Sequence, residues 1–151
     1  MKASILIKEA LQFCQEKASW RVSGISDLRR GDKWTHSTFR YGLARQISNH
    51  LLNNYREIKA VYIFGSTLED RAGSTSDVDL ILVVQKKNEL LLHYIRKLKA
   101  EVLRAYKKLA GNGTAGLTDL LDVNIVDDEE LKQKKGCASL IDSIYTPAIK
   151  I

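Results

Sequence analysis

Two aspartates at the start of an apolar run are the residues with the clearest potential for chemistry. Asp77 and Asp79 stand two residues apart and lead into Leu80-Ile81-Leu82-Val83-Val84. Side chains alternate along a strand, so the two carboxylates would share one face. Like charges repel, and ionised carboxylates are costly beside apolar residues. A divalent cation removes both costs, and Mg²⁺ prefers oxygen ligands. The spacing therefore predicts a metal site at the start of this strand.

A Gly-Ser turn precedes this pair and could supply an anion site. The apolar run Val61-Tyr62-Ile63-Phe64 ends in Gly65-Ser66. Glycine lets the backbone approach a ligand closely. The stretch Ser66-Thr67-Leu68-Glu69 has the pattern of a capping box and predicts a short helix that ends at Gly73. Because a helix N-terminus favours anions, phosphate is the expected ligand. The lesser candidates for phosphate contacts are Thr67, Arg71 and Lys59.

A third carboxylate interrupts another apolar run. In Leu120-Leu121-Asp122-Val123-Asn124-Ile125-Val126, Asp122 would share a face with Asn124. A carboxylate in a buried strand needs a partner or a metal, so Asp122 is a candidate for contact with a cation. Asp119 and Asp127 are alternatives if the strand register differs.

Other phosphate or nucleophile motifs do not fit these residues. The glycines are not followed by the Gly-Lys-Ser/Thr of a P-loop. Ser66 has no histidine in a motif relation to it and no nucleophile-elbow pattern. We therefore do not expect Ser66 to act as a nucleophile.

Together these motifs resemble those of the DNA polymerase beta nucleotidyltransferase superfamily. Gly65-Ser66 is followed after ten residues by Asp77-x-Asp79, and Ser76-Asp77-Val78-Asp79-Leu80 is similar to the form found in the small minimal nucleotidyltransferases (MNT type). The resemblance covers roughly residues 59 to 131. In that superfamily a third acidic residue comes from a neighbouring strand, and Asp122 matches it by position.

The resemblance implies an enzyme that transfers a nucleoside monophosphate from a nucleoside triphosphate to a hydroxyl acceptor and releases pyrophosphate. ATP is the expected donor and Mg²⁺, or Mn²⁺, the expected metal. Two ions about 3.5–4 Å apart would stabilise the attacking and leaving oxygens. The implied metal ligands and catalytic residues are Asp77, Asp79 and Asp122. The implied nucleotide-binding residues are Gly65, Ser66 and Thr67.

The acceptor is left open by the motifs. The resemblance to minimal nucleotidyltransferases implies a helical HEPN-type partner protein, as in toxin–antitoxin pairs. A different class of function is a non-catalytic or weakly catalytic nucleotide-binding module that acts by occupying its partner. Transfer to an RNA end would suit the basic surface but has no readout motif behind it. Transfer to a small molecule such as an aminoglycoside would need a pocket that a short chain has little room to build.

The rest of the chain predicts an α+β fold with a small mixed sheet. Helical periodicity is found at residues 2–18, 38–56 and 87–109, and strand patterns at 59–64, 78–84 and 120–126. In the second helix the apolar stripe steps by four residues, and Arg40 falls off that stripe. Acidic residues 127–131 predict a short capped helix, and 136–151 reads as a tail. We expect a helical N-terminal extension, 1–58, packed on a polymerase beta palm-like core, 59–151.

Composition adds weaker constraints. The net charge of +6 favours anionic partners such as nucleotides. In residues 19–37, arginines lie between Trp20 and Trp34; they either contact a nucleotide or RNA strand or form an irregular, packed connection. Cys14 and Cys137 lack metal-ligand spacing and read as reduced thiols, which predicts a cytoplasmic protein. No apolar run approaches membrane-spanning length, so we expect no membrane association.

Overall fold

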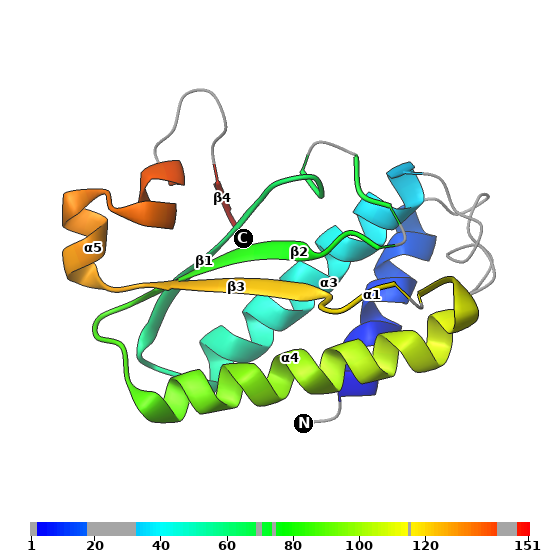
Figure 1. Ribbon diagram of the computed structural model, residues 1–151, viewed down its shortest axis with the longest axis horizontal. Coiled ribbons are helices and arrows are strands. Elements are labelled where there is room, and N and C mark those ends of the chain that lie inside the picture. The colour runs from blue at the N-terminus through cyan, green and yellow to red at the C-terminus, as the bar shows by residue number, and fades with distance from the viewer. Residues whose placement is uncertain (1–2, 18–32, 69–70, 74, 115, 142–147) are drawn as a thin grey trace.

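The computed structural model describes residues 3–17, 33–68, 71–73, 75–114, 116–141 and 148–151 (Figure 1). Its helices are α1 (Ala3–Lys17), α3 (Lys33–Asn54), α4 (Glu89–Ala110) and α5 (Asp128–Gln133). Its strands are β1 (Ile58–Phe64), β2 (Val78–Val84), β3 (Leu121–Val126) and β4 (Ile149–Lys150). Two short 3₁₀ turns, η1 (Gly111–Thr114) and η2 (Gly136–Leu140), follow α4 and α5. The predicted α+β class is confirmed.

The four strands form one mixed sheet in the order β3-β2-β1-β4. β1 runs antiparallel to both β2 and β4, whereas β2 and β3 are parallel. Parallel strands need a long crossover, and α4 supplies it between β2 and β3. Mixed strand directions are what the family resemblance implied. β3 is an edge strand, so one side of it has no strand partner in the described part of the chain.

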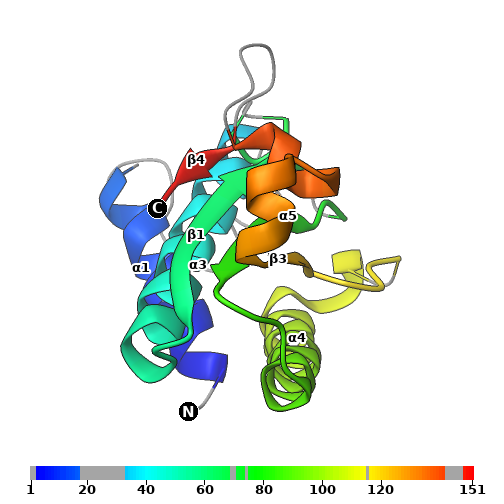
Figure 2. The ribbon, with the colours of Figure 1, turned by 90° about the vertical axis from the view of Figure 1, so that its left-hand side faces the viewer.

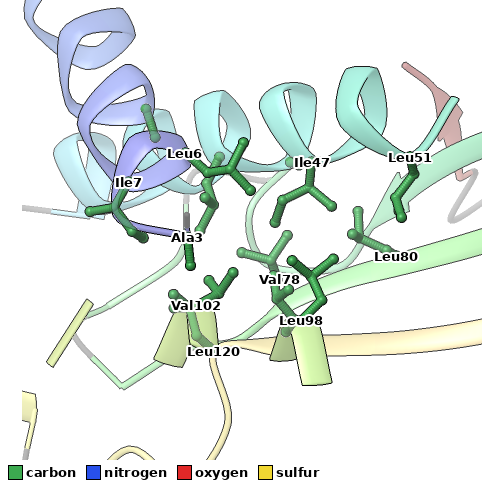
Figure 3. Close-up of a cluster of buried hydrophobic side chains, with 14 of the residues drawn as sticks. Ala3, Leu6, Ile7, Ile47, Leu51, Val78, Leu80, Leu98, Val102 and Leu120 are labelled. Atoms are coloured by element: carbon green, nitrogen blue, oxygen red, sulfur yellow. The ribbon is translucent and has the colours of Figure 1, made fainter. Parts of the chain in front are cut away.

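The sheet has a helix-covered face and a more open face. On the first, α1, α3 and α4 pack against alternate residues of β2, namely Val78, Leu80, Leu82 and Val84. Figure 3 shows Leu6 and Ile47 on one side of this core and Leu98 and Val102 on the other. On the second face Ile81 and Val126 pack with Ala138 and Ala148. Figure 2 shows α5 on the opposite side of β1 from α1 and α3. Side chains alternate between the two faces along β2, so Asp77 and Asp79 lie on the same face as Ile81, which is the open face.

Local signals explain where α4 begins and ends. Asn88 caps it, because its side-chain oxygen accepts a hydrogen bond from the Leu91 N–H at 2.7 Å. Its apolar stripe, Leu91, Ile95, Leu98, Val102 and Tyr106, faces the sheet. At Gly111 the backbone has a φ of 75°, which favours glycine, and the helix ends there.

Three sequence predictions need correction. α3 begins at Lys33 rather than at residue 38, because Thr35 and Ser37 are buried by tertiary packing that no apolar periodicity reveals. The expected tail contains η2 and β4, and β4 adds a fourth strand beside β1. Asp122 is exposed, because β3 is the edge strand of the sheet and is not buried on both sides. Trp20 and the arginines beside it lie outside the described residues. None of the described helices is long and apolar enough to cross a membrane.

Candidate functional site

Three carboxylates meet at the end of the sheet where β2 and β3 begin. Asp77 directly precedes β2, Asp79 is the second residue of β2, and Asp79 lies opposite Asp122 in the parallel β2–β3 register. One carboxylate oxygen from each residue lies within 4.8 Å of the others. Hereafter these three residues are called the carboxylate cluster. The alternatives are not part of it: Asp127 caps α5, and Asp119 is exposed and outside the group.

The cluster is electrostatically strained in the absence of a cation. Burial, followed by the charges of Asp77 and Asp122 and a hydrogen bond with Asp122, raises the pKa of Asp79 to about 7. The pKa of Asp77 is raised by burial and by Asp122, and the charge of Arg40 acts in the opposite direction. A divalent cation would relieve this repulsion, and carboxylate oxygens are suitable ligands for Mg²⁺ or Mn²⁺. The residues present therefore fit a divalent metal.

Gly65 lies directly against the cluster. Its φ is 82°, which L side chains rarely adopt. A Cβ at this position would fall on Asp79 Oδ2 and lie 3.2 Å from its Cγ. Phe64, the preceding residue, pairs with Asp79 across the β1–β2 ladder. The absence of a side chain at Gly65 thus keeps the Asp79 carboxylate in place and leaves bare backbone beside it.

After Gly65 the chain forms turns. The Leu68 N–H donates to the Gly65 carbonyl at 3.1 Å, and the Arg71 N–H donates to the Ser66 carbonyl at 3.0 Å. Residues 66–68 are turns rather than the regular helix that the capping-box pattern predicted. Glu69, the second half of that pattern, lies outside the described residues. Ser66 is half-buried and stands next to Gly65, so it remains close to the carboxylate face.

Thr67 is placed differently from its two neighbours. It is only 4% exposed, and its hydroxyl has no hydrogen-bond partner among the described residues. It lines a cavity of about 380 Å³ between α1, α3 and the turn. Aromatic rings form much of the wall of this cavity, which is lined by Phe13, Lys17, Trp34, Ser37, Thr38, Tyr41, Thr67 and Leu68. Trp34 also packs against the main core.

Two of the lesser phosphate candidates are now placed. Lys59 lies at the far end of β1, where its Nζ pairs with Asp128 at 2.8 Å. The β1–β2 register sets Ile58 opposite Val84, so Lys59 is remote from the carboxylate cluster, and its suggested phosphate contact is wrong. Arg71 is exposed in the loop before β2.

Cys137 approaches the cluster from η2. Burial, followed by the charges of Asp122 and Asp79, raises the pKa of its thiol. Cys14 is fully buried in α1, and burial raises its pKa to about 11. Both cysteines are free thiols, as predicted.

A buried arginine behind the cluster was missed by sequence reasoning. Arg40 is fully buried although it falls off the apolar stripe of its helix. Its Nε donates to the carbonyl of Ser76, the residue before Asp77, at 2.9 Å. The only sequence signal was its place on a helix beside the motif, which does not distinguish a buried arginine from a solvated one.

A family model described as "Polymerase beta, Nucleotidyltransferase" matches residues 46–137, which is more than half of the chain. The chain belongs to the polymerase beta nucleotidyltransferase family. The match contains Gly65, Ser66 and all three members of the carboxylate cluster. No curated protein and no solved structure gives a significant match.

Membership of this family indicates nucleotidyl transfer as the general chemistry of the chain. Divalent metals are typical of the family. The carboxylate cluster is the group of acidic residues that could hold them. The match begins inside α3, at residue 46, so Arg40 and Ser37 lie before the matched residues.

Proposed function

We propose that this nucleotidyltransferase transfers a nucleoside monophosphate, AMP from ATP, to a hydroxyl acceptor and releases pyrophosphate. The observation that carries the proposal is the convergence of Asp77, Asp79 and Asp122 beside the bare backbone of Gly65. In the reaction, a bond forms between the acceptor oxygen and the α-phosphorus as the bond from the α-phosphorus to the pyrophosphate oxygen breaks. The acceptor hydroxyl loses its proton.

The proposed roles of the residues rest on the family resemblance and are supported by their positions. Asp77 and Asp79 would hold Mg²⁺ or Mn²⁺ at the triphosphate, and Asp122 would hold the ion nearest the acceptor and accept the acceptor's proton. When bound, the ions neutralise the triphosphate and polarise the attacking and leaving oxygens. Gly65 and Ser66 would bind the phosphates. Thr67 follows them in the turn, but its buried side chain lines the cavity beside α1 and α3. Preorganised charge and positioning supply most of the catalysis in such a site.

We further propose that the acceptor belongs to a partner protein, of the helical HEPN type that accompanies minimal nucleotidyltransferases in toxin–antitoxin pairs. Asp122 is exposed and sits on the edge strand β3, which supports approach of a large acceptor from that side. The test is transfer of label from α-³²P ATP to such a protein. Label that stays in ATP with every HEPN-type protein offered would contradict this assignment.

The donor site is tested by calorimetry with Mg²⁺–ATP. The wild type should bind, the Asp77→Asn, Asp79→Asn double variant should not, and omission of Mg²⁺ should abolish wild-type binding. Asp128→Asn is the matched control, because Asp128 pairs with Lys59 at the other end of the sheet. It should bind as the wild type does. Equal binding by the double variant and the wild type would refute the proposed site and favour the non-catalytic module.

A further inference from the structure

The loop that carries Asp77 is held by α3. The Ala72 N–H donates to Ser37 Oγ at 3.0 Å, and Arg40 Nε donates to the Ser76 carbonyl at 2.9 Å. Ser37 and Arg40 are three residues apart and so lie on one face of α3. Figure 1 shows the loop between β1 and β2 beside the first turns of this helix. Two side chains of one helix thus hold the loop at two points, at Ala72 and at Ser76.

Hydrogen bonds within the loop connect the residues held by α3 to the backbone just before Asp77. The Gly73 N–H donates to Ser76 Oγ at 2.9 Å, and the Ser76 N–H donates to the Gly73 carbonyl at 3.2 Å. This closed turn stands directly before Asp77. The next residue, Val78, donates its N–H to the Leu120 carbonyl at 2.7 Å, which begins the pairing with the β3 segment. The backbone on both sides of Asp77 is therefore fixed, on one side by α3 and on the other by the sheet.

Arg40 is a buried residue of the core rather than a surface residue. Its side chain is fully buried, its Nη2 lies 3.4 Å from the Tyr106 hydroxyl of α4, and its guanidinium stands 5.5 Å from the centre of the Tyr106 ring. Its Nη1 lies 3.4 Å from the carbonyl of His36. A buried guanidinium costs much free energy of desolvation, which these polar contacts offset, so Arg40 is held in one place by its surroundings.

We propose that Arg40, with Ser37, is a positioning residue that holds the Gly73–Asp77 turn so that the Asp77 carboxylate points at Asp79 and Asp122. The effect on metal binding rests on the proposed function, whereas the effect on the turn does not. Both residues lie on the part of α3 that precedes the matched segment. Arg40 holds the loop backbone, its charge also counteracts the rise that burial causes in the pKa of Asp77, and it does not itself touch the reacting atoms.

Hydrogen exchange tests the turn without any metal. We would compare Arg40→Met and Arg40→Lys with the wild type, and Ser37→Ala with its matched control Ser48→Ala. Ser48 is a buried serine of the same helix, but it donates to the Ile151 carbonyl at 3.4 Å instead of contacting the loop. The amides to follow are Gly73 and Ser76, with Ile81 in the middle of β2 as the reference. In Arg40→Met the exchange rate of the Gly73 and Ser76 amides should rise about tenfold or more relative to the Ile81 amide. In Ser37→Ala it should rise about two- to tenfold. Arg40→Lys should restore part of the protection, and Ser48→Ala should leave it unchanged.

Mn²⁺ binding, followed by the electron paramagnetic resonance signal of the free ion, tests the effect on the cluster. Arg40→Met should bind Mn²⁺ at least about tenfold more weakly than the wild type. Unchanged exchange at Gly73 and Ser76 in folded Arg40→Met would overturn the inference. If Arg40→Met does not fold, Ser37→Ala decides: an effect no greater than that of Ser48→Ala overturns it. Absence of Mn²⁺ binding by the wild type would instead overturn the proposed function, and exchange would still decide the role of Arg40.

Discussion

At the scale of single residues, Asp79 is the most perturbed group of the cluster. Burial and the neighbouring carboxylates raise its pKa to about 7 from an ordinary 3.8. A raised carboxyl pKa means that the folded protein favours the protonated form. Its contribution to stability is complete below about pH 4 and is lost as the pH rises through 7. Metal affinity changes in the opposite direction, because the ion binds the deprotonated form.

The first prediction is that the metal-free protein loses stability between pH 5 and pH 8, and that Asp79→Asn reduces this loss. At pH 8 the variant should be more stable than the wild type by about 1 kcal/mol, after allowance for solvent screening. Urea unfolding in EDTA at the two pH values measures both quantities. The same pH slope in the variant and the wild type would show that Asp79 is not the group responsible.

Gly65 gives the second prediction. Gly65→Ala should lower the free energy of unfolding by about 1–3 kcal/mol, because alanine is strained at a φ of 82°. It should also weaken Mn²⁺ binding, because the new Cβ would displace the Asp79 carboxylate. The matched control is Gly136→Ala, which also has a positive φ, 53°, but no heavy atom within 4 Å of an added Cβ; it should lose stability and keep its Mn²⁺ affinity. A stable Gly65→Ala protein with normal Mn²⁺ affinity would contradict the described contact.

At the scale of elements, the capping of α5 distinguishes the structural role of Asp127 from the metal-binding role proposed for Asp122. Asp127 Oδ1 accepts from the Glu130 N–H at 2.8 Å, and Glu130 reaches back to the Asp127 N–H. Such a capping box stabilises the start of a helix. The Asp127 carboxylate is therefore engaged in capping α5, although Asp127 lies only five residues after Asp122 in the chain.

The third prediction contrasts these two residues. Asp127→Ala should lower the free energy of unfolding by about 1 kcal/mol and leave Mn²⁺ affinity unchanged. Asp122→Asn should weaken Mn²⁺ binding and have little effect on stability, because Asp122 is exposed. Chemical unfolding and Mn²⁺ titration of both variants provide the comparison. The reverse result would identify Asp127 as the third ligand.

Elements with strong periodicity were predictable from the sequence. β2 has the bounds that its apolar run indicated, and α1 and α4 differ from the predicted ranges by one or two residues. β4 was not predictable, because a two-residue strand has no periodicity and depends on pairing with β1. The first turn of α3 was missed for a related reason, since its polar residues are buried by neighbouring elements.

The carboxylate cluster was predictable because like charges at strand spacing are unusual in an apolar run. The residues that hold the cluster in place were not predictable from the sequence. Arg40 reads as a surface residue in any pattern of hydrophobicity, and its burial depends on contacts with Ser76 and Tyr106, which are 36 and 66 residues away along the chain. Local sequence patterns carry no information on such pairings.

At the scale of the whole molecule, ligand binding should stabilise the fold. A ligand whose free concentration is one hundred times its dissociation constant adds about 2.7 kcal/mol to the free energy of unfolding. For a chain of this size that corresponds to a rise in Tm of about 5–10 °C. The cluster lies where β2 and β3 begin, beside the loop after β1, so a metal and nucleotide bound there would restrain this end of the sheet.

The fourth prediction is therefore a rise in Tm of this size with saturating Mg²⁺–ATP, measured by differential scanning calorimetry. The Asp77→Asn, Asp79→Asn variant should show no such rise, and Asp128→Asn should behave as the wild type does. A rise of equal size in the double variant would mean that the nucleotide stabilises the protein from another site.

Cys137 offers an internal reporter of metal occupancy. The charges of Asp122 and Asp79 contribute to the raised pKa of its thiol, and a bound dication would cancel them. The thiolate fraction should then increase, so an alkylating reagent at pH 8 should modify Cys137 faster in the presence of Mg²⁺ than in EDTA. Cys14 is fully buried and would contribute no background labelling. The alkylation rate of this one thiol would thus follow the filling of the cluster in the unmodified protein, without a nucleotide analogue or an introduced probe.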